Sequence, residues 1–377
     1  MSEWKKTSLR DLIVIKNGKD HKKLKNGQYP VYGSGGIMRY ADSYLYDQES
    51  VLLPRKGTLN NIQFVTEPFW TVDTCYYTVV NRDKVLPYFL YCCLCKMDIQ
   101  SLNTGSAVPS MTFEKYYSIE VPIPPLSTQQ RIATILSRYD SLIENYQKQI
   151  KLLEEAAQRL YKEWFIDLRF PGHENTKIVD GLPEGWEKKK ISDVCETVGG
   201  GTPSTKVPAY YKGGRIKWVT PTDITRNNCI CLLDTDKKIT EEGLRNSSTK
   251  MVPAGTILMT SRASVGYFGI ADFEVCTNQG FISCIPIPNM QMYLLFNLMS
   301  RVDEIRKKAG GSTYLEISKS VFRNFDIVCP SEIILLQFQD KASLVLKKEN
   351  TLSLQIRLLT EARDRLLPKL MSGEITV

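Results

Sequence analysis

Histidine is scarce in this 377-residue sequence, and long uninterrupted apolar runs are missing. The only histidines, His21 and His173, lie in polar stretches, so the chain has almost no material for histidine-based acid–base or metal chemistry. No apolar run is long enough to cross a membrane, and the N-terminal residues lack the apolar core of a secretory signal. We therefore expect a cytoplasmic protein that does not contact a membrane.

Cysteine is present but forms no metal-binding pattern. The ten cysteines lie mostly inside apolar segments, as thiols do in a reducing compartment. Cys92 and Cys95 are spaced as a C-x-x-C pair, but their apolar run has no second pair and no nearby histidine. The sequence therefore predicts no metal site.

Motifs for catalysis are also missing. The glycine runs at 33–36 and 199–201 lack the Lys-Ser/Thr of a phosphate-binding loop and are typical of turns. The pair Pro124-Pro125 is preceded by Ile123 and followed by Leu126, whereas an amino-methyltransferase needs Asp, Asn or Ser before such a pair and an aromatic residue after it. We therefore expect a chain without catalytic residues and without a cofactor of its own.

The stretch 127–164 carries the strongest pattern in the chain. Ser127 and Gln130 are spaced as a capping box at a helix N-terminus. Beyond them, apolar residues recur at alternating steps of four and three, which is the seam of a coiled coil. The predicted seam residues are Ile132, Leu136, Tyr139, Ile143, Tyr146, Ile150, Leu153 and Leu160. At about 1.5 Å per residue the helix is on the order of 55 Å long, which suits a spacer.

The far end of the chain repeats this pattern at an offset of 206 residues. The repeated seam consists of Phe338, Val345, Leu352, Ile356, Leu359 and Leu366. Either helix alone could be an ordinary amphipathic helix of a globular core, but two copies at one offset favour a duplication and a paired spacer. Glu349 and Arg363 are charged at seam positions, so they either pair across the helices or fix the register at some expense of stability.

Two β-rich segments of similar sequence accompany the helices. We predict a mostly β domain at 1–126, with strands at 44–46, 51–53, 62–65 and 75–80 and a helix near 86–98. The segment 186–330 repeats it with an additional loop-rich insertion of roughly 23 residues. The sequence thus predicts an α+β protein in which two mostly β domains are separated by two long antiparallel coiled-coil helices, with a pseudo-twofold internal repeat. The predicted boundaries are 1–126, a first helix at 127–168, a linker at 169–185, 186–330, and a second helix with the C-terminal tail at 331–377.

Basic and amide side chains gather at the predicted turns of both β-rich segments. The formal net charge of +8 fits a polyanionic partner. Arg and Lys can donate to guanine edges or phosphates, Asn can pair with adenine, and Gly-Ser loops can bring backbone N–H groups close to phosphate. The alternative is that these residues are ordinary solvated loop residues. The candidate DNA-binding residues are Lys22, Lys23, Arg39, Arg55, Lys56, Asn60, Asn61 and Ser106 in the first segment, and Lys206, Lys212, Thr222, Asp223, Arg226, Asn227, Arg262, Gln279 and Ser312 in the second.

Short motifs in a fixed order connect these patterns to a family. They are Ile123-Pro124-Pro125-Leu126 with Gln129-Gln130, Leu182-Pro183-Glu184-Gly185-Trp186, Gly200-Gly201-Thr202-Pro203, Ile257-Leu258-Met259-Thr260 with Arg262 and Gly266, and Leu366-Leu367-Pro368-Lys369-Leu370-Met371-Ser372-Gly373-Glu374-Ile375. With this order, the duplication and the heptad helices, the chain resembles the specificity (S) subunit of a type I DNA restriction-modification enzyme over essentially its whole length.

The resemblance implies a non-catalytic subunit with several partners. Two target-recognition domains would each contact one half of a bipartite, asymmetric site in double-stranded DNA, and the helices would dock two methyltransferase (M) subunits. Restriction (R) subunits would join through that core, and S-adenosylmethionine, ATP and Mg are expected on the partner subunits. Apolar residues off the seam could pack against partner helices or against the chain's own domains; they are Ile135, Leu142, Leu152, Leu344, Leu354 and Leu358.

Two alternatives belong to other classes. The chain could be the specificity half of a bifunctional methyltransferase-nuclease, or a coiled-coil protein scaffold that does not read DNA. Purified chain that transfers no methyl group from S-adenosylmethionine without an M partner argues against the first. Salt-sensitive DNA binding argues against the second.

Overall fold

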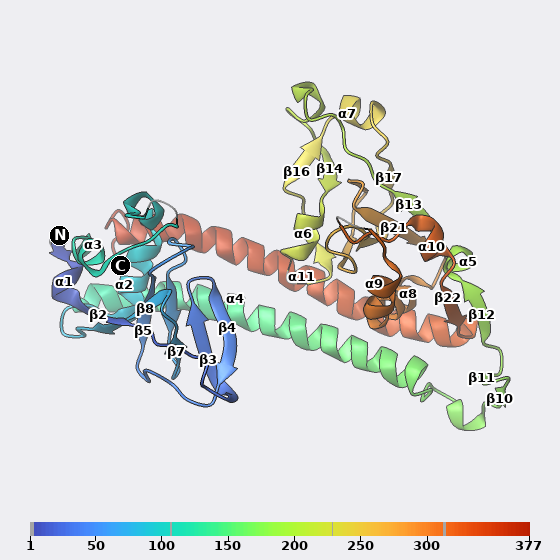
Figure 1. Cartoon of the computed structure of the whole chain (residues 1–377), viewed down its shortest axis with the longest axis horizontal. Helices are drawn as coiled ribbons and strands as arrows, with labels where there is room; N and C mark the ends of the chain where they lie inside the picture. The colour runs from blue at the N-terminus through green and yellow to red at the C-terminus, as the bar shows by residue number, and fades with distance from the viewer. Residues whose placement is uncertain (1–3, 106–107, 228, 312–313) are drawn as a thin grey trace. The chain divides into compact units, whose positions relative to one another are not determined.

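The computed structural model describes residues 4–105, 108–227, 229–311 and 314–377 (Figure 1). The chain divides into two compact units. Unit 1 consists of Met1–Ile143 and Leu358–Val377, and unit 2 consists of Glu144–Arg357. The long helices α4 (Leu126–Tyr161) and α11 (Glu332–Met371) therefore contribute residues to both units.

Unit 1 is built on strands that pair antiparallel except for β3 and β7, which pair in parallel; they are coloured blue to cyan in Figure 1. One sheet has the order β2 (Ile13–Asn17), β8 (Cys75–Val80), β5 (Ser50–Pro54), β6 (Gln63–Val65). A second has the order β4 (Gly36–Ala41), β3 (Asn26–Gly33), β7 (Trp70–Thr71), and β1 (Lys5–Ser8) pairs with β9 (Glu120–Ile123). The helical elements are α1 (Leu9–Leu12), α2 (Pro87–Cys95), η1 (Ile99–Leu102) and α3 (Phe113–Tyr117). Every residue of β5 is buried, as expected for a strand covered on both faces.

The core of unit 1 includes parts of both long helices. Phe89 of α2 lies in one buried cluster with Ile132 and Leu136 of α4 and Leu370 of α11. The early part of α4 therefore packs with the last turns of α11 inside this unit. Since a buried aliphatic or aromatic side chain is worth about 1.5–3 kcal/mol, this cluster ties the β domain to the helix ends.

Unit 2 repeats the plan with more elements. One sheet has the order β13 (Cys195–Gly199), β21 (Phe281–Pro286), β18 (Ile257–Thr260), β19 (Phe268–Ala271), β15 (Cys231–Leu232). The other has the order β16 (Lys237–Ile239), β14 (Ile216–Val219), β20 (Val275–Thr277), β17 (Met251–Val252), and β12 (Glu187–Lys190) pairs with β22 (Asp326–Cys329). The helical elements are α5 (Ile191–Val194), η4 (Pro208–Tyr210), α6 (Pro221–Thr225), α7 (Glu241–Arg245), α8 (Gln291–Ser300), α9 (Val302–Lys308) and α10 (Lys319–Arg323). After α4 the chain continues through η2 (Lys162–Ile166), η3 (His173–Asn175), β10 (Ile178–Val179) and β11 (Leu182–Pro183).

An aromatic cluster joins the helices to the β domain of unit 2. The ring of Phe165 lies 4.9 Å from that of Phe338 on α11 and 4.7 Å from that of Tyr293 on α8. Tyr161, at the end of α4, accepts a hydrogen bond from the buried amide of Asn297 (3.0 Å). The late part of α4 thus packs with the early part of α11, so the two helices run antiparallel within this unit.

The predicted fold class is confirmed, but two local predictions were wrong. Helix α4 begins at Leu126, directly after the two prolines, so Ser127 lies inside the helix and does not cap it. The segment 44–46 is no strand, because only Tyr46 makes an isolated bridge, to Phe69. The helix predicted near 86–98 is confirmed as α2, which spans Pro87–Cys95. The predicted domain boundaries stay a prediction, because each compact unit takes part of both helices.

All of the predicted seam residues are buried or half-buried. Their packing along one continuous seam stays a prediction. The two charged seam residues behave differently. Arg363 donates from Nη1 to Asp140 Oδ1 (2.7 Å), so in unit 1 it pairs across the helices. Glu349 is 1% exposed and accepts a weak hydrogen bond from the Cys231 thiol (Sγ–Oε2 3.8 Å), so it faces the β domain of unit 2.

Candidate nucleic-acid interface

Two loops of unit 2 meet beyond the end of β18, and backbone hydrogen bonds hold them. One loop follows β18 and contains Arg262; the other precedes α10 and contains Glu316. The bonds are Ala263 N–H to Leu315 O (2.8 Å), Ile317 N–H to Ser261 O (3.0 Å) and Gly310 N–H to Glu316 O (2.9 Å). Because Ser261 and Ile317 are buried, the backbone beside both charged residues is anchored in the domain.

Unit 1 contains the same pair of loops at an offset of 206 residues. Its bonds are Gly57 N–H to Pro109 O, Met111 N–H to Arg55 O and Thr104 N–H to Ser110 O, each 2.9 Å. Lys56 occupies the position of Arg262, and Ser110 occupies that of Glu316. The two units therefore present different side chains on one loop framework.

The residue after each cation has left-handed backbone geometry. Gly57 has a φ of +91° and Ala263 has a φ of +60°. Glycine adopts this region freely, whereas a residue with a Cβ pays about 1–2 kcal/mol there. The turn is thus retained in unit 2 although its residue is strained, which is common at functional loops.

Two of the predicted residues of unit 2 share a cleft of about 300 Å³. Arg262 and Gln279 line it together with Tyr314, which is 60% exposed. Arg262 Nε lies 3.6 Å from Glu316 Oε2, and both side chains are about half exposed. The Gln279 Oε1 atom accepts a hydrogen bond from the Thr202 hydroxyl. A flat aromatic surface beside donors and acceptors is suited to contact with bases or sugars.

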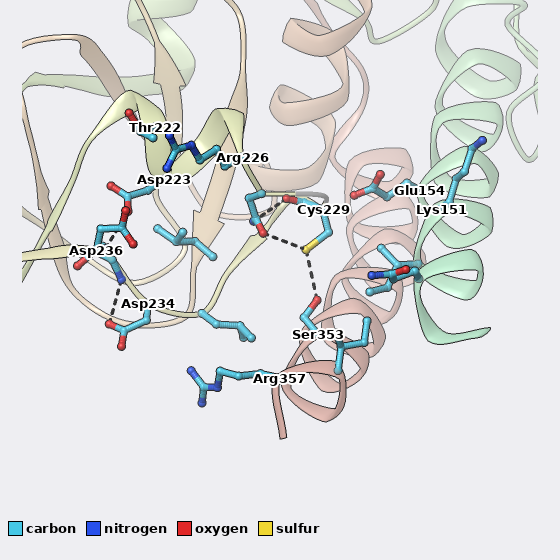
Figure 2. A pocket seen from close by; sticks show the side chains of 17 residues that line it. Lys151, Glu154, Thr222, Asp223, Arg226, Cys229, Asp234, Asp236, Ser353 and Arg357 are labelled. Atoms are coloured by element: carbon cyan, nitrogen blue, oxygen red, sulfur yellow. Dashed lines mark hydrogen bonds between the residues drawn. The ribbon is translucent and has the colours of Figure 1, made fainter. Parts of the chain in front are cut away.

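Four other predicted residues of unit 2 line a larger cavity of about 830 Å³ (Figure 2). Thr222 and Arg226 are exposed at its α6 side. Across the cavity lie Lys151 and Glu154 of α4 and Ser353 of α11, whose hydroxyl is 3.3 Å from the Cys229 thiol. The four predicted residues therefore lie next to the segments of α4 and α11 that belong to unit 2.

Asp223 and Asn227 have structural partners in this region. Asp223 Oδ2 accepts hydrogen bonds from the backbone N–H and the hydroxyl of Thr220 (2.7 Å each), which caps α6. Asn227 Nδ2 donates to the carbonyl oxygens of Cys229 and Cys231 (2.8 Å each). Their side chains shape the loop, whereas Lys206 and Lys212 are exposed elsewhere in the insertion.

In unit 1 the predicted lysines Lys22 and Lys23 are exposed on a loop that internal contacts support. The Lys22 backbone N–H donates to Asp20 Oδ1 (3.0 Å), and this bond lowers the pKa of the Asp20 carboxyl. Arg39 is not simply solvated: its Nη2 donates to Leu24 O (3.0 Å) and to Asn26 Oδ1 (3.1 Å). Arg39 thus stabilises the segment that follows Lys22 and Lys23.

The remaining predicted residues of unit 1 are partly committed to the fold. Arg55 donates to the carbonyl of Asp73 (3.3 Å). Asn60 bonds Asp98 Oδ1 (3.2 Å) and accepts from Gln100 N–H (2.7 Å), so both ends of its amide are used at η1. Asn61 donates to Ser34 O (2.8 Å), whereas the Lys56 side chain is exposed. Ser106 and Ser312 lie outside the described residues.

Glu316, Ser110 and Tyr314 were missed as candidates. The offset of 206 that relates the two helices also relates Ser110 to Glu316, so the sequence contained a usable signal for this pair. No pattern in the sequence indicated that the Tyr314 side chain is exposed.

The described part of the chain has neither a metal-binding cluster nor a membrane-spanning helix. No cluster of three or more His, Cys, Asp or Glu side chains there is arranged to hold a metal ion. Within the same residues, none of the helices combines the length and apolarity needed to span a bilayer.

Comparisons with known proteins agree with the architecture. The family described as "Type I restriction modification DNA specificity domain" matches residues 1–155 and 183–347. The HindI specificity subunit of Haemophilus influenzae is 26% identical over 364 residues, covering 78% of this chain and 79% of that protein. The MjaIX specificity subunit of Methanocaldococcus jannaschii is 39% identical over 153 residues, but the match covers 40% of this chain and only 35% of that protein.

A solved structure has the same fold. The S subunit of a type I restriction-modification system from M. genitalium superposes with a TM-score of 0.65 at 16% identity, covering 98% of this chain and 96% of that one. Because the family match includes both β-rich parts, most of α4 and the first part of α11, the chain belongs to the type I restriction-modification DNA specificity family.

Proposed function

We propose that the chain is the non-catalytic specificity subunit of a type I restriction-modification system and that each unit reads one half of a bipartite DNA site. The repeated loop pair carries this proposal. Lys56 and Ser110 stand in unit 1 where Arg262 and Glu316 stand in unit 2. Different side chains on one backbone framework select different bases, so the two half-sites should differ in sequence.

The long helices set the separation of the two half-sites in this proposal. Helix α4 has 36 residues and α11 has 40, so each is on the order of 55–60 Å long at about 1.5 Å per residue. Paired as a coiled coil, they would act as a ruler, because a fixed distance between two readers selects a fixed number of intervening base pairs.

The same helices are proposed to dock two methyltransferase subunits, through which restriction subunits join. Exposed apolar side chains support this role, since they gain by being covered. They are Leu142 and Leu152 on α4, and Leu344, Leu354 and Leu358 on α11. Ile135 differs, because it packs against the core of unit 1.

The catalytic chemistry is assigned to the partners. S-adenosylmethionine, ATP and Mg would bind to the methyltransferase and restriction subunits, and this chain would supply DNA recognition and assembly. We also place the chain in the cytoplasm, where all ten cysteines can remain the free thiols that they are in the structure.

The test is to map methylated positions in DNA from cells that carry this chain and its methyltransferase partner. A bipartite site with a constant gap is expected. Lys56→Ala should alter one half of it and Arg262→Ala the other, with a cost of about 1–3 kcal/mol for a base contact. If both variants altered the same half, or if methylation did not depend on this chain, the proposal would be wrong.

A further inference from the structure

The neighbouring charges of Arg262 and Glu316 contribute little to folding. Their Nε–Oε2 distance is 3.6 Å and both side chains are about half exposed, so water screens the attraction. Arg301 and Glu304 in the same unit form a much closer pair, at 2.7 Å. The Arg262–Glu316 pair is therefore better placed to meet a ligand than to stabilise the domain.

The backbone under this pair is rigid. Glu316 exchanges two hydrogen bonds with Gly310 (2.8 and 2.9 Å), and its neighbour Ile317 is bonded to buried Ser261. Ala263, next to Arg262, keeps the left-handed geometry despite its Cβ. A rigid backbone reduces the entropy lost on binding and holds the two side chains in one relative position.

The two side chains differ in hydrogen-bonding capacity. The guanidinium offers only donors, and the ionised carboxylate offers only acceptors. Within the described residues, the Arg262 guanidinium pairs with Glu316 through Nε, which leaves its terminal nitrogens toward the cleft side available as donors. Those nitrogens can therefore meet two acceptors outside the protein while the carboxylate meets a donor beside them.

A G·C base pair presents this pattern in the major groove. Guanine offers the acceptors O6 and N7, and cytosine offers the N4 amino group as a donor next to them. A phosphate offers acceptors only, so Glu316 would be repelled by it. We propose that Arg262 and Glu316 together form a reading site for one G·C pair, with Arg262 on guanine and Glu316 on cytosine; this rests on the DNA reading proposed above.

The repeat makes the inference specific to one half-site. In unit 1, Lys56 is a single ammonium group and Ser110 is a hydroxyl that can donate or accept. Ser110 does not discriminate between bases as a carboxylate does. The strict G·C position should therefore lie in the half-site of unit 2.

The experiment selects bound duplexes from a fully randomised DNA pool with the full-length chain in complex with its methyltransferase partner. Wild type should select two half-sites, one containing an invariant G·C pair. Glu316→Gln and Glu316→Ala should both weaken the preference for that pair by about 5-fold to 150-fold and leave every other position unchanged. Glu304→Gln, which disrupts the Arg301 pair, is the matched control and should leave the selection unchanged.

The outcomes separate this inference from the proposed function. Retained preferences at the other positions of the unit 2 half-site show that unit 2 of a variant is folded, because Glu316 belongs to that unit. If the Glu316 variants bound all duplexes more tightly with every preference retained, Glu316 would only repel DNA and the reading site would be refuted. If wild type selected a bipartite site without a G·C pair in the affected half, the inference alone would fail. If wild type selected no sequence, the proposed function would fail with it.

Discussion

Replacing Glu349 with glutamine should stabilise unit 2 in alkaline solution and have little effect in acid. Glu349 lies on α11 and is 1% exposed. Burial, followed by the nearby charge of Glu154, raises the pKa of its carboxyl from 4.5 to about 8. The Cys231 thiol donates to it only weakly at 3.8 Å, and the Glu154 Oε1 atom already accepts from Ile230 N–H (2.9 Å). Glu349 therefore has no cation to stabilise its charged form among its described neighbours.

The sign of the effect follows from the two pKa values. Below about pH 4.5 Glu349 is protonated in both states and imposes no penalty. Between about pH 4.5 and 8 the unfolded chain releases the proton and the folded chain keeps it, so stability falls by about 1.36 kcal/mol per pH unit. Above about pH 8 the loss levels off, on the order of 4–5 kcal/mol. Glutamine has no proton to lose, so Glu349→Gln should remove this dependence.

The assay is urea unfolding at pH 5, 7 and 9, followed by pulsed hydrogen exchange of peptides from α11. A local readout is needed because two units need not unfold in one step. Glu155→Gln, on the exposed side of α4, is the matched control and should change little at any pH. The reasoning is refuted if Glu349→Gln is less stable than wild type at pH 9, because the ionised carboxylate would then be stabilised in the folded state.

Two further substitutions test other features. Arg363→Ala should reduce the unfolding free energy of unit 1 by about 1–2 kcal/mol, because half-buried Asp140 would keep only the Tyr88 hydroxyl as a partner. An unchanged urea midpoint would show that the Arg363–Asp140 pair does not stabilise the unit. Ala263→Gly should stabilise unit 2 by up to about 1 kcal/mol, because Gly57 holds the same turn in unit 1 without strain; a thermal midpoint that falls would show that the Ala263 methyl group contributes to packing.

The sequence predicted the parts of the fold that depend on local periodicity. The seam of α4 repeats every three or four residues, and side chains such as Ile132 and Leu136 are accordingly buried. The cap at Ser127 was wrong because Pro124 and Pro125 already end the preceding strand. The helix starts at Leu126, two residues before the first helical position that a cap at Ser127 implies.

The predicted contact residues were harder to judge because their partners are distant in sequence. Asn60 was a plausible adenine reader, yet its amide bonds Asp98, which is 38 residues away. Arg39 bonds the carbonyl of Leu24 across β3 and β4. Neither partner can be identified from a local pattern, because loop residues are positioned by tertiary contacts. The internal repeat is the exception, since Lys56 and Ser110 locate Arg262 and Glu316 directly.

The repeat also distinguishes the contacts that are the same in both units from the side chains that differ between them. In unit 1, Gln129 of α4 accepts a hydrogen bond from Leu86 N–H at the start of α2 (2.9 Å). In unit 2, Gln339 of α11 accepts one from Met292 N–H at the start of α8 (2.9 Å). Leu86 and Met292 are related by the offset of 206, whereas Gln339 lies four residues beyond the position that corresponds to Gln129.

This contact is therefore made in both units from different turns of their helices. The backbone bonds between the loops are likewise the same in both units, while the side chains that they display differ. Because the constant contacts are backbone groups and helix amides, substitutions at the displayed positions need not disturb the core. Such a protein can acquire a new DNA specificity in one unit while the other unit and the helices stay as they are.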